Sequence, residues 1–148
     1  MFHTPHTTIN IRINFMTVLI IFLIAFLINI IWEFCHCNLY STCVNWPPKK
    51  RILLLFFASF KDALFIVIFY LISIFPFGNE NILAIPLSFS YFIILSLLFS
   101  FVDEKISIKY KRWEYFSKMP KVFGVGVTPL LELAITGTIT FIIVFLIK

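Results

Sequence analysis

The sequence predicts an all-α polytopic membrane protein, folded as an antiparallel four-helix transmembrane bundle in a single domain over residues 1–148. Apolar residues make up 61% of the chain and charged residues only 13%. Four apolar runs approach the roughly 20 residues that a helix needs to cross a bilayer. Almost all ionisable groups lie at the same end of these runs, and the remaining residues are too few for a soluble domain.

The first span is expected over residues 15–37 and the second over residues 52–75. No small-x-small cleavage site follows the first run, so we interpret it as a retained span rather than a removed signal peptide. The second run is interrupted by Lys61 and Asp62, and Pro76 and Gly78 then predict a turn.

The third span is expected over residues 87–108 and the fourth over residues 129–147. Pro86 suits the first position of the third helix, because proline lacks the N–H that would be unpaired there. Thr128 is the expected N-cap of the fourth helix, and Pro129 its first helical residue.

The basic residues predict how the spans are oriented. The two loops that follow the first and third spans hold nine of them, against two on the opposite side, Arg12 and Lys148. Since basic loops stay in the cytoplasm, we expect a multi-pass protein of the cell membrane with both loops inside and both termini outside. The same bias explains the net charge of +5 without a nucleic-acid partner.

Ionisable residues, which are costly to place in a membrane, lie at the same depth in several of the expected spans. Glu33, His36, Asp62 and Glu104 are therefore the candidate catalytic residues, expected to converge in the cytoplasmic half as acid, base or ligand groups. Glu132 lies at the same depth, but the positive end of its own helix is a sufficient structural reason for its carboxylate.

Lys61 and Asp62 lie in mid-helix, where each charge costs about 2.5 to 3.5 kcal/mol. One interpretation is that Asp62 faces inward and is paired, either for function or to specify helix packing. The alternative is that the membrane segment begins near Ala58 and that Lys61 extends its ammonium group to the interface.

Glu33 and His36 are three residues apart and share a helix face. This is a metal-ligand spacing in carboxylate-bridged four-helix bundles, but those centres use two such pairs. We therefore predict no metal centre, and the sequence identifies no cofactor. Either an interfacial hydrogen-bonded pair or an acid and base pair remains.

Small hydroxylated residues continue two of the acidic positions at four-residue steps. Ser96 and Ser100 precede Glu104, and Thr136 and Thr140 follow Glu132. Such stripes are typical of closely packed membrane helices, so packing is the favoured interpretation. The three cysteines fall on the expected cytoplasmic side, where we expect structural or incidental reduced thiols.

The loop before the fourth span is basic and aromatic. Arg112, Trp113 and Tyr115 are the candidate substrate-binding residues, placed over an entrance from the cytoplasmic leaflet. The alternative is an interfacial belt that only orients the protein. Gly124 and Gly126 are expected to let the loop fold tightly.

The loop also contains most of a sequence pattern that resembles the pattern of a known group of proteins. Its pattern R-W-x-Y-x3-M-P-x3-G-x-G-x2-P-L begins at Arg112. Two further landmarks lie upstream: the pattern W-E-x2-H, which begins at Trp32, and Asp62. In this order the landmarks resemble a group of small, uncharacterised prokaryotic membrane proteins with four spans. The resemblance implies the fold and the membrane location, and it implies no activity.

Two functions follow as expectations. The first is a polar site in the cytoplasmic half of the bundle that binds or acts on a lipid or another hydrophobic small molecule, with membrane lipids as partners. The alternative is a non-catalytic accessory or assembly subunit, in a homo-oligomer or with a partner membrane protein. Ion transport is disfavoured because the outer halves of the spans carry almost no ionisable groups.

Overall fold

The computed structural model describes residues 13–146, and these are mostly helical. Four helices are long and apolar enough to cross a membrane, as the sequence predicts. They are α1 (Phe15–His36), α3 (Pro48–Ile74), α4 (Pro86–Lys109) and α5 (Val127–Leu146). Arg12 and Lys148, the two basic residues assigned to the opposite side, lie outside the described residues.

Short elements connect the long helices at each end of the molecule. The 3-10 helix η1 (Cys37–Leu39) and helix α2 (Ser41–Asn45) follow α1, and η2 (Ile82–Ala84) precedes α4. Strands β1 (Lys121–Val122) and β2 (Val125–Gly126) pair antiparallel just before α5. Gly124 has a φ of +79° in the turn between them, a conformation that glycine adopts without strain, so the tight loop is confirmed there.

The helix starts agree with the sequence in two cases, at Phe15 and Pro86, and differ in the other two. Pro86 is the first residue of α4, as expected. Helix α3 begins at Pro48, four residues before the predicted span, because this proline also suits a first helical position. Thr128 is not an N-cap: α5 already begins at Val127, whose N–H donates to the Pro120 carbonyl at 2.9 Å.

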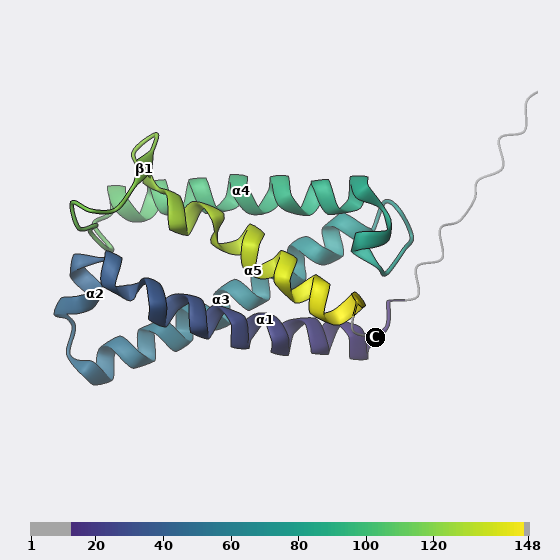
Figure 1. The fold of residues 1–148 in the computed structure, drawn as a ribbon, viewed down its shortest axis with the longest axis horizontal. Coiled ribbons are helices and arrows are strands. Elements are labelled where there is room, and N and C mark those ends of the chain that lie inside the picture. The colour runs from purple at the N-terminus through teal and green to yellow at the C-terminus, as the bar shows by residue number, and fades with distance from the viewer. Residues whose placement is uncertain (1–12, 147–148) are drawn as a thin grey trace, which may run out of the picture.

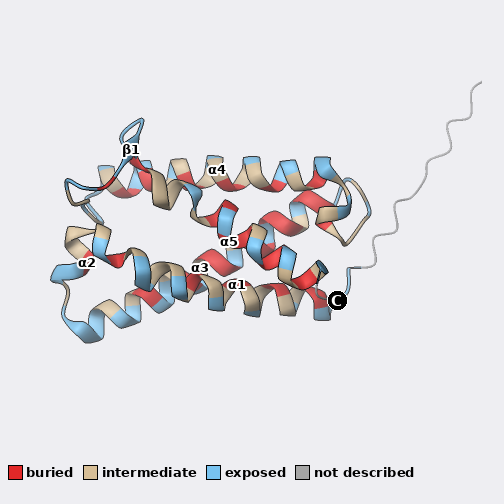
Figure 2. Cartoon of the chain, viewed as in Figure 1, coloured by how far each residue is buried: buried red, intermediate tan, exposed pale blue. Residues whose placement is uncertain are grey.

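The long helices pack side by side, and α3 and α5 also contact each other. Helix α1 contacts α3 and α5, and α4 contacts the same two helices. Figure 1 shows successive long helices leading back and forth along the molecule, with α2 and β1 at the same end. Buried residues lie on the facing sides of the helices and exposed residues on the outer sides (Figure 2). The outward large apolar residues, such as Leu53, Phe57 and Leu98, suit contact with lipid.

Small residues allow close packing between α4 and α5, as the stripes predict. Ser96, Thr136 and Thr140 are fully buried. A Cβ atom added at Gly137 would lie 2.2 Å from Cζ of Phe92, so only glycine fits against this ring. The hydroxylated stripes therefore face the interior.

The expectation of reduced thiols is wrong for two of the three cysteines. Cys37 and Cys43 form a disulfide, and their Cα atoms are 5.7 Å apart. The physical reason is that η1 and α2 turn the chain back on itself directly after α1, which brings the two side chains together over Leu55. Cys35, two residues before Cys37, keeps an exposed free thiol.

Candidate functional site

A cavity of about 270 Å³ lies where α1 and α4 end and where α3 and α5 begin. All four long helices contribute carboxylates to its lining: Glu33 from α1, Asp62 from α3, Asp103 and Glu104 from α4, and Glu132 from α5. Tryptophan side chains also line it, namely Trp32, Trp46 and Trp113. The cavity thus combines acidic groups with broad aromatic surfaces.

Three of the carboxylates face one another across the cavity. One carboxylate oxygen from each of Glu33, Asp62 and Glu132 lies within 4.8 Å of the other two. Asp62 is only 6% exposed, so it faces inward, as one of the two interpretations predicts. Two ionised carboxylates at this separation repel each other by about 3.5 kcal/mol at an effective dielectric constant of about 20. The three are therefore stable together only with protons or a cation between them.

Glu132 is the member of this group that sequence reasoning left out. Its Oε1 is buried and has no hydrogen-bond partner among the described residues. The helix N-terminus seemed a sufficient reason for an acid at this position. The topology already places Glu132 at the depth of the other acids, but the sequence does not show that its side chain lies beside those of Glu33 and Asp62.

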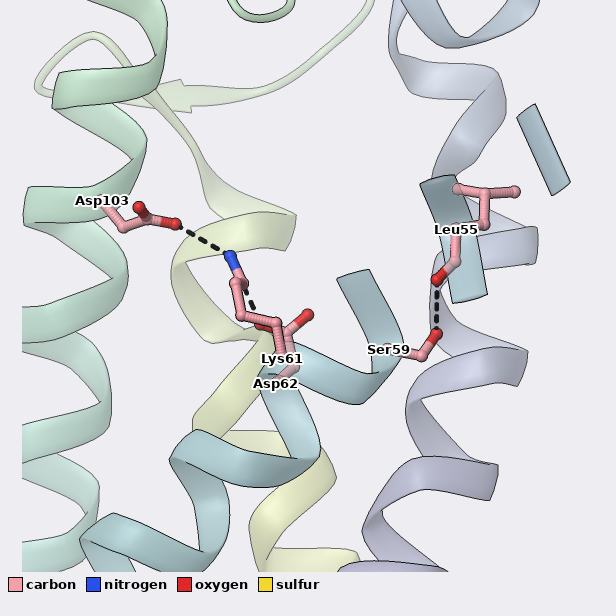
Figure 3. Close-up of polar contacts among 5 residues, drawn as sticks. All are labelled: Leu55, Ser59, Lys61, Asp62 and Asp103. Atoms are coloured by element: carbon pink, nitrogen blue, oxygen red, sulfur yellow. Dashed lines mark hydrogen bonds and ion pairs between the residues drawn. The ribbon is translucent and has the colours of Figure 1, made fainter. Parts of the chain in front are cut away.

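Lys61 supplies the one ammonium group beside these acids. Its Nζ donates to Oδ2 of Asp103 on α4 at 3.2 Å and lies 3.6 Å from Oδ1 of Asp62 (Figure 3). The Lys61 side chain is 36% exposed, whereas that of Asp62 is 8% exposed. The acid is therefore buried and paired, whereas the point at which the membrane segment begins stays a prediction.

His36 lines the same cavity but is held by its own helix. Its Nδ1 lies 2.9 Å from the Trp32 carbonyl, and its ring stacks on the Trp32 indole at 4.2 Å between centroids. Because a carbonyl oxygen only accepts, Nδ1 carries the proton, and in the neutral ring Nε2 keeps its lone pair. This is the tautomer that a general base needs.

Glu104 is engaged by the loop after α4. Its Oε1 accepts hydrogen bonds from the Trp113 indole N–H at 3.0 Å and from the Tyr115 hydroxyl. That hydroxyl in turn accepts from the Gly126 N–H at 3.0 Å. Burial and the bond to Glu104 raise the pKa of Tyr115, which keeps the hydroxyl protonated as a donor. The arrangement holds the loop on α4.

The same loop is joined to the segment after α1. The Ser41 N–H donates to the Glu114 carbonyl at 2.9 Å, and the Phe116 N–H donates to the Leu39 carbonyl at 3.1 Å. Tyr40 pairs with Tyr115 between these bonds. The two interhelical segments are thus held together by backbone hydrogen bonds at the end of the cavity.

The three predicted substrate-binding residues have different surroundings. Arg112 and Trp113 line the cavity, whereas Tyr115 reaches it only through Glu104. The four candidate catalytic residues all line the cavity, so their convergence is confirmed as a matter of position. Their chemical role remains a prediction.

Neither a family model, nor a curated protein, nor a solved structure matches the chain. The function is therefore argued from the cavity itself. Its acids can exchange protons, hold a cation or accept hydrogen bonds, and Nε2 of His36 is placed to accept a proton. Arg112 can contact an anionic group at the rim.

Proposed function

We propose that the four long helices form an antiparallel transmembrane bundle, and that the cavity at its polar end binds the polar head of a membrane lipid or another amphiphile. The observation that carries this proposal is the cavity of about 270 Å³, with carboxylates inside and tryptophans around them. Ligand sites typically combine apolar and aromatic walls with a few convergent polar groups. If the bound molecule is also turned over, Glu33, Asp62 and the free Nε2 of His36 are the groups available for proton transfer.

The rim and the interior suit different parts of such a ligand. Arg112 and the basic loop favour an anionic group near the surface, at about 1 kcal/mol per basic residue. The carboxylates favour a hydrogen-bond donor or a positive group deeper inside. The apolar chain of the ligand would leave between the helices, whose outer sides carry large apolar residues.

Filling the cavity tests the proposal without changing its charge. Ala58 lines the cavity, so Ala58→Phe should exclude the ligand, whereas Ala84→Phe places the same ring at an exposed position in η2. The protein is purified in nanodiscs of mixed lipids, and bound lipid is identified and counted by native mass spectrometry. We expect a lipid that stays with the wild type and with Ala84→Phe and is lost from Ala58→Phe. Equal retention by all three proteins would refute the cavity as the binding site.

Orientation is a separate proposal. We place the cavity at the cytoplasmic leaflet, following the nine-to-two distribution of basic residues. The Cys37–Cys43 disulfide supports the reverse orientation, since such bonds persist in oxidising compartments. A reporter fused after Lys148 distinguishes the two. Periplasmic activity of the reporter supports our placement, and cytoplasmic activity overturns it.

One observation favours the alternative of an accessory subunit with packing roles. Both contacts of Glu104 go to its own loop, through Trp113 and Tyr115, which is a structural use of a buried acid. This alternative predicts a partner protein that co-purifies at a fixed ratio. It also predicts that Ala58→Phe leaves lipid content unchanged.

A further inference from the structure

The group of three carboxylates in the cavity has a geometry that the lipid proposal does not use. Glu33, Asp62 and Glu132 come from α1, α3 and α5, and one oxygen of each lies within 4.8 Å of the others. Oxygens that coordinate one ion are separated by such distances, because each lies about 2.0 to 2.6 Å from the ion. The three helices thus bring their oxygens around a common point.

A second observation indicates a missing partner at this point. Oε1 of Glu132 is buried, yet it accepts no hydrogen bond from any described residue. Buried carboxylate oxygens are normally paired, and an orphaned one calls for an explanation such as an ion. The Lys61 ammonium group pairs with other acids instead. Its Nζ lies 3.2 Å from Oδ2 of Asp103 and 3.6 Å from Oδ1 of Asp62.

Charge leads to the same conclusion. Three ionised carboxylates and the Lys61 ammonium carry a formal charge of −2, even before Lys61 is shared with Asp103. Asp103 and Glu104 line the same cavity and add to the negative charge, which a divalent cation would reduce. Among the described residues, the group of possible ligand atoms that lie within 4.8 Å of one another holds three carboxylate oxygens and no histidine nitrogen or cysteine sulfur. An all-oxygen set favours Mg²⁺, Ca²⁺ or Mn²⁺ over zinc or copper.

We infer that Glu33, Asp62 and Glu132 form a binding site for a divalent cation of the oxygen-preferring class. The site differs from the metal centre that the sequence disfavoured, because that one depended on His36. It rests on the proposed function only in sharing the cavity, where the cation would face the polar head of the ligand. Protons on the carboxylates are the competing way to relieve the same repulsion.

Mn²⁺ is the probe, because its paramagnetic resonance signal reports free and bound ion directly. The full chain is purified in detergent, stripped of metal by chelator and titrated with Mn²⁺ in the absence of added phospholipid. The variants are Glu33→Gln, Asp62→Asn and Glu132→Gln. Glu104→Gln is the matched control, since it removes an acid that lines the same cavity but is engaged by the loop. Thermal unfolding of each protein verifies the fold.

We expect one Mn²⁺ per chain, displaced by excess Mg²⁺ or Ca²⁺, with affinity reduced about tenfold or more in each of the three variants and less than about threefold in the control. If one variant does not fold, the other two provide the same test. No binding by the wild type at about 1 mM Mn²⁺ overturns the inference and leaves protons as the explanation. Binding that survives all three substitutions also overturns it. Lipid retention, measured separately in chelator, shows whether the proposed function fails with it.

Discussion

Replacing Tyr115 by phenylalanine tests the contact that holds the loop on α4. The substitution keeps the ring and removes the hydroxyl, which donates to Glu104 and accepts from the Gly126 N–H. A hydrogen bond to a charged group contributes about 1.5 to 3 kcal/mol and a neutral one about 0.5 to 1.5 kcal/mol. The expected loss in the free energy of unfolding is therefore about 2 to 4 kcal/mol.

The loss is measured by reversible unfolding of the detergent-solubilised protein with sodium dodecyl sulfate. Tyr110→Phe is the control, because Tyr110 belongs to the same loop but is 69% exposed. We expect a change below about 0.5 kcal/mol for this control. A double-mutant cycle of Tyr115→Phe with Glu104→Gln should give a coupling above about 1 kcal/mol. A loss below about 1 kcal/mol for Tyr115→Phe, or a coupling near zero, would refute the reasoning.

Three further predictions use the same unfolding assay. Cys37→Ser should lose about 2 kcal/mol, the stabilisation expected for closing a short loop, whereas Cys35→Ser should change stability by less than about 0.5 kcal/mol; without reductant, only Cys35 should react with a maleimide. Gly137→Ala should cost about 1 to 3 kcal/mol through overpacking against Phe92, and a neutral result would show that the ring moves aside freely. Since the pKa of Tyr115 is raised above its ordinary value of 10.0, the stability that depends on its protonated hydroxyl is complete below about pH 10 and is lost as the pH rises further. The difference in the free energy of unfolding between wild type and Tyr115→Phe should therefore stay constant from about pH 6 to 9 and decrease above pH 10.

The long helices could be predicted from the sequence because their signal is local. A run of about 20 apolar residues carries enough transfer free energy to decide a span on its own. Proline at Pro86 also marks its helix start without tertiary information. Thr128 shows where this fails. A threonine before a proline resembles a cap, but the Pro120 carbonyl, just before the β-hairpin, accepts from the Val127 N–H, and the helix begins two residues before Pro129.

The sequence predicts the depth at which the site lies but not which side chains meet there. The ends of the spans place Glu33, Asp62 and Glu104 at one level, and the structure brings them to one cavity. Which acids face each other depends on helix rotation, and the apolar residues around each helix leave rotation poorly specified. Glu132 was therefore undervalued, and the engagement of Glu104 by its own loop could not be foreseen. The Cys37–Cys43 pair also depends on a turn that the spacing alone does not determine.

The backbone bonds between the two interhelical segments have a consequence for binding kinetics. The backbone N–H groups of Ser41 and Phe116 each donate to the opposite segment, so the wall at this end of the cavity is already ordered before a ligand binds. Little ordering entropy then opposes association. If the proposed lipid binds in this cavity, we expect it to exchange between the helices rather than through this wall, at a rate set by the motions of the helices.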